Sequence, residues 1–360
     1  MPGGWLSYFR LMSTVQILDP SRRAVVTWLF IVAALVFLMV VVGGITRLTE
    51  SGLSMTDWHP VTGWLPPLSD AAWQAEFEKY KAFPEYQKVN LGMSLDEFRT
   101  IYAWEFSHRL LGRIIGLAFF VPMAVFMLTG RIRRREIPWF LFLLVAGGSQ
   151  GVLGWFMVQS GLIDRPDVSQ YRLAAHLALA FAIYALLLWT AWSVREEGRD
   201  RRALSGMRTP AIILAALVLL QIVIGAFVAG INAGHIYNTW PLMDGALVPD
   251  GLFAGGSGLA ALFDDHLTIQ FVHRILAYAL LGVAIWTMLR GRRVGGRAKP
   301  ASMGVMHAIA LQILLGIATL VMVVPVWLGA LHQATALLVW TAALWLVRLA
   351  WTDARARIGD

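Results

Sequence analysis

The sequence predicts an all-α polytopic membrane protein. We expect eight transmembrane helices, arranged as two tandem, pseudo-symmetric four-helix bundles with both termini on the cytoplasmic side. Three observations predict this class. The 360 residues are 58% hydrophobic and 14% charged, whereas soluble domains are about half apolar and about a quarter charged. Apolar stretches of membrane-spanning length recur along the chain, and motifs of its first half return in the second.

The spans follow from apolar runs of about 20 residues, the length of helix that crosses ~30 Å of hydrocarbon. Because their number is even, the chain returns to the side on which it began. We place the spans at residues 24–46, 107–129, 137–158, 172–193, 209–231, 268–289, 303–324 and 327–349.

Basic residues mark alternate loops. They cluster at 131–135, 195–208 and 290–299, after the second, fourth and sixth spans, whereas residues 232–266 contain neither Lys nor Arg. The positive-inside rule therefore places both termini in the cytoplasm, and a bacterial inner membrane is the expected location. This topology accounts for the net charge of +8, so no nucleic-acid partner is predicted.

The chain repeats itself, span by span. The first and fifth spans share their Gly–Gly–Trp spacing, the second and sixth a Phe-x-His-Arg motif, the third and seventh Gln-x-x-x-Gly, and the fourth and eighth Ala-x-His. The matching segments are Gly43 to Trp58 and Gly225 to Trp240, Phe106 to Arg109 and Phe271 to Arg274, Gln150 to Gly154 and Gln312 to Gly316, and Ala174 to His176 and Ala330 to His332. We therefore divide the chain into an N-terminal half (1–195), a basic cytoplasmic linker (196–208) and a C-terminal half (209–360).

Two further features lie between these motifs. The polar stretch from Ala71 to Lys88 predicts a short helix on the outer surface, and the segment from Gly251 to Gly258 predicts an irregular loop. Gln150, Gln221 and Gln312 each precede a glycine by four residues. We interpret them as donors of interhelical hydrogen bonds beside close helix packing.

Four histidines form two repeated pairs near the outer ends of their spans: His108 with His176, and His273 with His332. Histidines that face each other across a four-helix bundle can ligate a metal, most naturally haem iron. The chain has no cysteine, which excludes thiolate-ligated haem. A zinc site is less favoured, because no third ligand recurs with the pairs. The alternatives to haem ligation are that the histidines are ordinary buried polar residues or that they form a proton relay.

The residues four positions after these histidines are all small, which would leave room for a flat macrocycle. They are Gly112, Ala180, Ala277 and Ala336.

Charged residues surround the first pair more than the second. Arg109 and Arg274 follow a histidine in each half, and Arg113 lies one turn further on in the first half. These arginines are candidate partners for haem propionates, although snorkelling to headgroups is the alternative.

The halves differ in their carboxylates. Glu105 precedes His108 by three residues, and its counterpart is Gln270; Arg47 and Glu50, at the mouth of the first site, likewise have uncharged counterparts. A carboxylate can accept protons and an amide cannot, so the first half is the candidate for a reaction. Instead of a role in the reaction, Glu105 could be a carboxylate at the membrane interface or an ion-pair partner of Arg109.

The segments Gly43 to Met55 and Trp104 to Arg109 resemble the haem A synthase family, in the branch shared by mitochondria and alphaproteobacteria. The resemblance covers essentially the whole chain. It implies oxidation of the C8 methyl group of haem O to a formyl group, which yields haem A for terminal oxidases. It also implies that Glu105 is catalytic, that His108 and His176 hold the substrate haem O, and that His273 and His332 hold a haem b cofactor. The cysteine pair of some bacterial members is absent.

The main alternative is a bis-His di-haem b membrane cytochrome that transfers electrons, and a haem carrier without chemistry of its own is another. A haem A synthase would require an electron acceptor, which the sequence does not identify. The enzyme that makes haem O is a further expected partner. Exposed small-residue faces permit a homo-oligomer. Both haem sites are expected toward the outer, periplasmic side of the bilayer.

Overall fold

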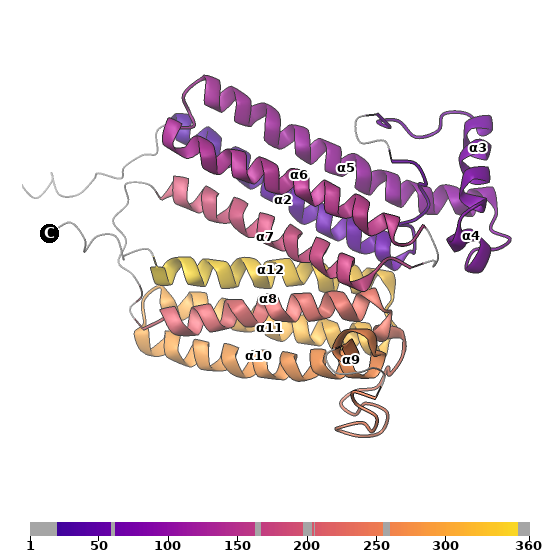
Figure 1. Ribbon diagram of the computed structural model, residues 1–360. Helices are drawn as coiled ribbons and strands as arrows, with labels where there is room; N and C mark the ends of the chain where they lie inside the picture. Colours follow the sequence, from indigo (N-terminus) through magenta and orange to yellow (C-terminus); the bar gives the residue numbers. More distant parts are fainter. Residues whose placement is uncertain are drawn as a thin grey trace, which may run out of the picture.

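The computed structural model describes residues 20–58, 62–162, 167–196, 204, 206–254 and 260–351. Within these residues the protein is helical and contains no β-strand, only one isolated bridge between Met243 and Ala246. Eight helices are long and apolar enough to cross a membrane (Figure 1). They are α2 (Pro20–Leu48), α5 (Leu95–Leu128), α6 (Ile137–Gln159), α7 (Gln170–Arg195), α8 (Arg208–Gly230), α10 (His266–Val294), α11 (Ala298–Val321) and α12 (Val326–Trp351). The predicted all-α class and the number of spans are confirmed.

The second span begins earlier than predicted. Apolar length placed its start at residue 107, but α5 starts at Leu95, where Ser94 and Glu97 form a capping box. The first turns of α5 are polar on one side, which removes them from a hydropathy window. Their other side carries Phe98 and Tyr102, which are buried against the outer segment. His108 therefore lies well inside a continuous helix.

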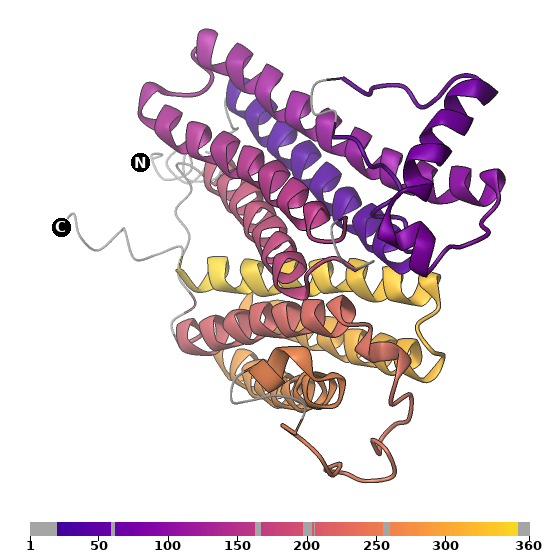
Figure 2. The same ribbon diagram turned by 45° about the vertical axis from the view of Figure 1, so that its right-hand side comes forward.

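The outer segment forms two helices where one was predicted: α3 (Asp70–Lys81) and α4 (Pro84–Lys88). Pro84 lacks a backbone N–H and so ends one helix and begins another. Phe77 and Tyr80 pack against Phe98 in an aromatic cluster. The cluster fixes α3 and α4 on the end of α5, beyond the long helices (Figure 2).

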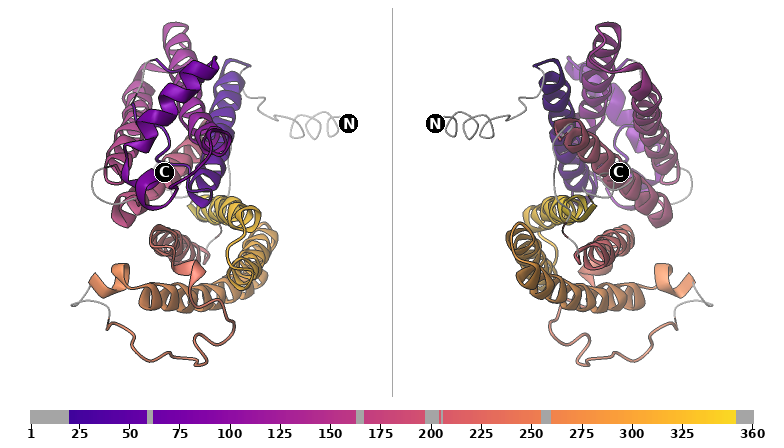
Figure 3. Two further views of the ribbon diagram at one scale, coloured as in Figure 1. Left: turned by 90° about the vertical axis from the view of Figure 1, so that its right-hand side faces the viewer. Right: turned by 90° about the vertical axis from the view of Figure 1, so that its left-hand side faces the viewer.

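Each half of the chain forms a ring of four helices. In the first half α2 packs against α5 and α7, and α6 packs against the same two helices. In the second half α8 and α11 each pack against α10 and α12. Helices α5 and α7 are therefore diagonal to each other, as are α10 and α12. Figure 3, seen along the helices, shows the two groups one above the other.

The two rings meet through α2 and α7 on one side and α8 and α12 on the other. Small residues allow close approach there, since Gly329 of α12 lies against the Leu48 side chain and Gly44 faces Gln333. Gln333 also donates to the carbonyl of Val40, at 2.9 Å. The four contacting helices bury 44–50% of their apolar segments, against 11–17% for α5, α6, α10 and α11. The latter four therefore leave most of their apolar segments exposed.

The main apolar core fills the end of the rings at which α2 begins and α12 ends, with Leu29, Phe140, Phe181, Leu214 and Leu346 among its buried residues. The long segments between α2 and α5 and between α8 and α10 lie at the opposite end (Figure 1). Most of the predicted linker and both chain termini lie outside the described residues, as do residues 255–259 of the glycine-rich loop.

Candidate functional site

The four histidines lie on diagonal helices of the two rings. His108 is on α5 and His176 on α7, while His273 is on α10 and His332 on α12. His108 lies near enough to His176 for the two imidazoles to influence each other electrostatically. The same holds for His273 and His332. All four are partly buried and lie toward the loop end of their helices, beyond the main apolar core. The rings thus bring together the pairs that the repeat predicts.

Each histidine ring packs against a glycine of the neighbouring helix. A Cβ atom added to Gly154, Gly225 or Gly316 would lie 2.9–3.1 Å from the Cε1 atom of the adjacent histidine ring, and one added to Gly43 would lie 2.9 Å from Nε2 of His108. These distances are shorter than ordinary van der Waals contact, so a larger residue at any of these positions would push the imidazole aside. The sequence showed these glycines as a repeat but not what they contact.

The three glutamines make the interhelical hydrogen bonds that the sequence predicts, and their partners are the histidines. The Nε2 atoms of Gln150, Gln221 and Gln312 donate to the backbone carbonyls of His176, His273 and His332, at 3.0, 3.0 and 2.9 Å. Each Nε2 also lies 3.2–3.3 Å from both ring nitrogens of the same histidine.

An amide nitrogen equidistant from both ring nitrogens lies over the face of the imidazole, because Cε1 fills the in-plane position between them. The in-line lone-pair directions of the ring therefore stay open to a metal. The Oε1 atoms of the three glutamines are buried and accept no hydrogen bond from the described residues. A neutral imidazole held in this way could serve as a ligand of haem iron.

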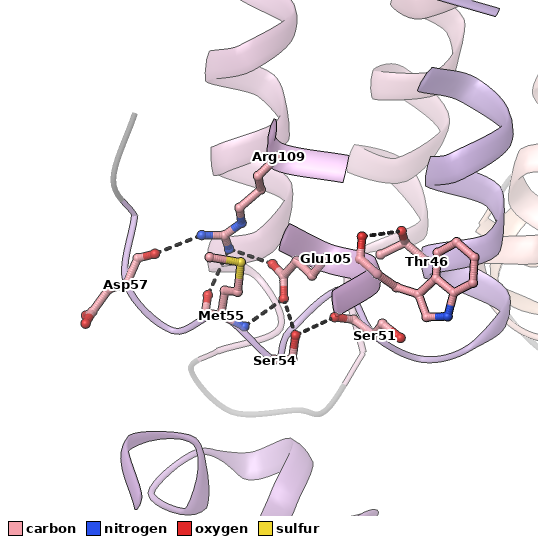
Figure 4. Close-up of polar contacts among 8 residues, drawn as sticks. Thr46, Ser51, Ser54, Met55, Asp57, Glu105 and Arg109 are labelled. Carbon is pink, nitrogen blue, oxygen red and sulfur yellow. Dashed lines mark hydrogen bonds and ion pairs between the residues drawn. The ribbon is translucent and has the colours of Figure 1, made fainter. Parts of the chain in front are cut away.

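Glu105 is 3% exposed and accepts hydrogen bonds on both carboxylate oxygens. Oε1 pairs with Arg109 at 2.6 Å, while Oε2 accepts from Ser54 Oγ at 2.8 Å and from the backbone N–H of Met55 at 2.7 Å. Arg109 also donates to the carbonyls of Met55 and Asp57, both at 2.8 Å. Figure 4 shows this network, which ties the loop after α2 to α5.

The second half repeats this geometry with an amide. Gln270, also 3% exposed, accepts from Arg274 at 2.7 Å and donates to the carbonyl of Ala233 at 2.7 Å. Arg274 donates to the carbonyl of Tyr237 at 2.8 Å. The loop of the first half thus offers donors to position 105, whereas the loop of the second half offers an acceptor to position 270.

The remaining candidates of the first half are Arg47, Glu50 and Arg113. Arg47 extends into the second half and donates to the carbonyl of Ala229 at 3.1 Å and to Asn232 Oδ1 at 2.9 Å. Glu50 is exposed and has a φ of 50°; Asn232, its repeat counterpart, has a φ of 57°. The shared left-handed turn supports the repeat alignment. Arg113 lies one turn beyond Arg109 on α5, partly buried.

No group of three or more His, Cys, Asp or Glu side chains that could hold a metal ion occurs among the described residues. Each pair would offer two imidazole ligands, which could hold a haem iron between them.

Fold and site together define a class: a polytopic helical membrane protein built as two four-helix rings, each with one histidine on each of two diagonal helices. Residues 26–344 match the family described as cytochrome oxidase assembly protein, and the chain belongs to this family.

Relatives cover nearly all of the chain. The haem A synthase of Parvibaculum lavamentivorans is 54% identical over 336 residues, which are 93% of this chain and 97% of the relative. The haem A synthases of Nitrosospira multiformis and Azorhizobium caulinodans are 49% and 50% identical, and each alignment spans 90% of this chain and 93% of the relative.

Proposed function

We propose that this protein is a haem A synthase, an oxidoreductase that converts the C8 methyl group of haem O into the formyl group of haem A for terminal oxidases. The observation that carries the proposal is the pair of histidines in each ring, in a chain about half identical to haem A synthases over most of its length. Converting a methyl into a formyl group adds one oxygen atom and removes electrons and protons, so the reaction also needs a source of that oxygen, such as water, and an electron acceptor.

We propose that the two histidine pairs bind different haems. His108 and His176 hold the substrate haem O, and His273 and His332 hold a haem b cofactor. A bound haem supplies the redox chemistry through its iron. The support is the asymmetry at one position of the histidine helices, since α5 carries the carboxylate Glu105 where α10 carries the amide Gln270.

Glu105 is the proposed proton acceptor of the first site. Its burial and its three hydrogen bonds keep the carboxylate in one position, and Arg109 balances its charge. The same contacts give Glu105 a structural role, because the network holds the loop over the first ring. The proposal therefore requires that catalysis and loop anchoring be separated by experiment.

The proposed function also implies a location and partners. The protein lies in a bacterial inner membrane, with both termini in the cytoplasm and the histidine end toward the periplasm. Arg109, Arg113 and Arg274 are proposed propionate contacts, and Arg47 and Glu50 border the first site. The enzyme that makes haem O is a proposed partner.

The test is co-expression of the chain with a source of haem O, followed by chromatography of the extracted haems. We expect haem A with the wild-type chain, and haem O but no haem A with Glu105→Ala, while haem binding persists. Gln270→Ala is the matched control, because it makes the same truncation at the repeat counterpart and should still yield haem A. Haem-loaded wild-type protein that forms no haem A would instead support a di-haem b cytochrome. Loss of haem from Glu105→Ala would make the carboxylate structural.

A further inference from the structure

His108 differs from the other three histidines in what holds its ring. His176, His273 and His332 each have a glutamine amide over the imidazole face, four residues before the glycine on which the ring packs. At the corresponding position before Gly43, the chain has Met39. A thioether donates no hydrogen bond. His108 accordingly makes no side-chain hydrogen bond to any of the described residues.

The His108 ring is also turned differently. The atom nearest to a Cβ at Gly43 would be Nε2, at 2.9 Å, and Cε1 would be 4.0 Å away. At the other three glycines Cε1 is the nearest atom, and Nε2 is 3.8–4.0 Å away. The Nε2–Cδ2 edge of His108 thus faces α2, whereas the other three rings turn their Cε1–Nδ1 edge toward the glycine.

The residue at position 39 does not fix this orientation of the His108 ring. The Met39 methyl group lies beside Gly112, one turn after His108 on α5, at 3.3 Å from a Cβ built there. The repeat counterparts of these two residues are Gln221 and Ala277. A glutamine that bonds to a backbone carbonyl is fixed, whereas methionine is flexible and fills space without directional bonds.

We propose that His108 is the exchangeable ligand of the substrate haem, released by the absence of a glutamine at position 39. Gln150, Gln221 and Gln312 are positioning residues that hold the other three imidazoles in place. The inference rests on the proposed function, in which one haem must enter and leave while the other stays. A haem held by two fixed histidines dissociates slowly, whereas one held by a fixed and a movable histidine can be exchanged.

The experiment measures haem transfer from the purified, haem-loaded protein in detergent to excess apomyoglobin. We expect two phases from the wild type, a fast one from the first ring and a slow one from the second. Met39→Gln should slow the fast phase about 10- to 100-fold, the range typical of changes in groups that orient metal ligands. Gln221→Met should accelerate the slow phase by a similar factor.

One control and a second readout accompany the kinetics. Met39→Leu changes the same position without adding a hydrogen-bond donor and should leave the fast phase unchanged. Electron paramagnetic resonance of the ferric protein should show a larger low-spin fraction in Met39→Gln and a larger high-spin fraction in Gln221→Met. If Met39→Gln does not fold, Gln221→Met with its slow phase and spin state decides alone.

Different outcomes would overturn the proposed function and the exchangeable His108 ligand. A wild-type protein that binds no haem would overturn the proposed function. Two bound haems whose transfer rates and spin states are unchanged in Met39→Gln and Gln221→Met would overturn this inference and leave the proposed function intact.

Discussion

Adding one methyl group beneath a histidine tests whether the imidazoles pack on glycine. In Gly316→Ala the new Cβ would lie 2.9 Å from Cε1 of His332, closer than nonbonded carbon atoms approach. Gly304→Ala is the matched control on the same helix, because a Cβ there meets nothing within 4 Å.

Both substitutions change the helix propensity in the same way, but only Gly316→Ala adds steric overpacking. Alanine favours a helix interior over glycine by about 1 kcal/mol, and this gain is common to both. Overpacking at position 316 costs about 1–3 kcal/mol, because the His332 ring or helix α11 must shift. Gly304→Ala should therefore stabilise the protein by about 1 kcal/mol. Gly316→Ala should be about 1–3 kcal/mol less stable than that control.

The assay is denaturant unfolding of both variants in the same detergent, with the haem content of the purified protein as a second readout. We expect Gly316→Ala to lose haem because its ligand is displaced, and Gly304→Ala to retain it. Equal stability and equal haem content in the two variants would refute the contact between the ring and the glycine.

Two further predictions concern the loop end of the protein. Burial raises the pKa of Glu85 in α4 to about 8 from 4.5. The folded protein therefore holds a proton that the unfolded chain has lost, and the unfolding free energy should fall as pH rises from about 4.5 to 8. Glu85→Gln should flatten this slope in denaturation curves across that range, and an unchanged slope would contradict the assignment. Arg109→Ala leaves the Glu105 carboxylate buried without its cation and should cost about 3–5 kcal/mol. Arg274→Ala leaves only neutral partners and should cost about 1–3 kcal/mol, so equal losses in urea unfolding would argue against an ionised Glu105.

Much of the fold could be predicted because its signals are local. The length of each apolar run and the charge of each loop depend on neighbouring residues alone, and both predicted the eight spans. The start of α5 was missed for the same reason, since Asp96, Glu97 and Arg99 lower the hydropathy of turns that are helical in the structure. What stabilises those turns is the packing of Phe98 on α3, which is a contact between distant segments.

The candidate site divides in the same way. The repeat predicted which histidines pair, and the rings put each pair on diagonal helices. It did not predict that Gln150 contacts His176, because the side-chain spacing on one helix says nothing about the neighbouring helix. It also did not predict that Glu105 would be engaged by Ser54 and Met55, whose positions depend on a loop without periodicity.

By itself the sequence determined the membrane class, the duplicated plan and the register of the four histidines, because hydrophobic length and repeated spacing are properties of the chain. Only the tertiary structure decided how the duplicated parts differ. The exchange of Gln221 for Met39 between the halves is visible in the sequence, but its meaning depends on which imidazole lies beside it. That contact exists only once two helices have packed, since glycine lets the backbones approach and the amide then reaches the histidine carbonyl.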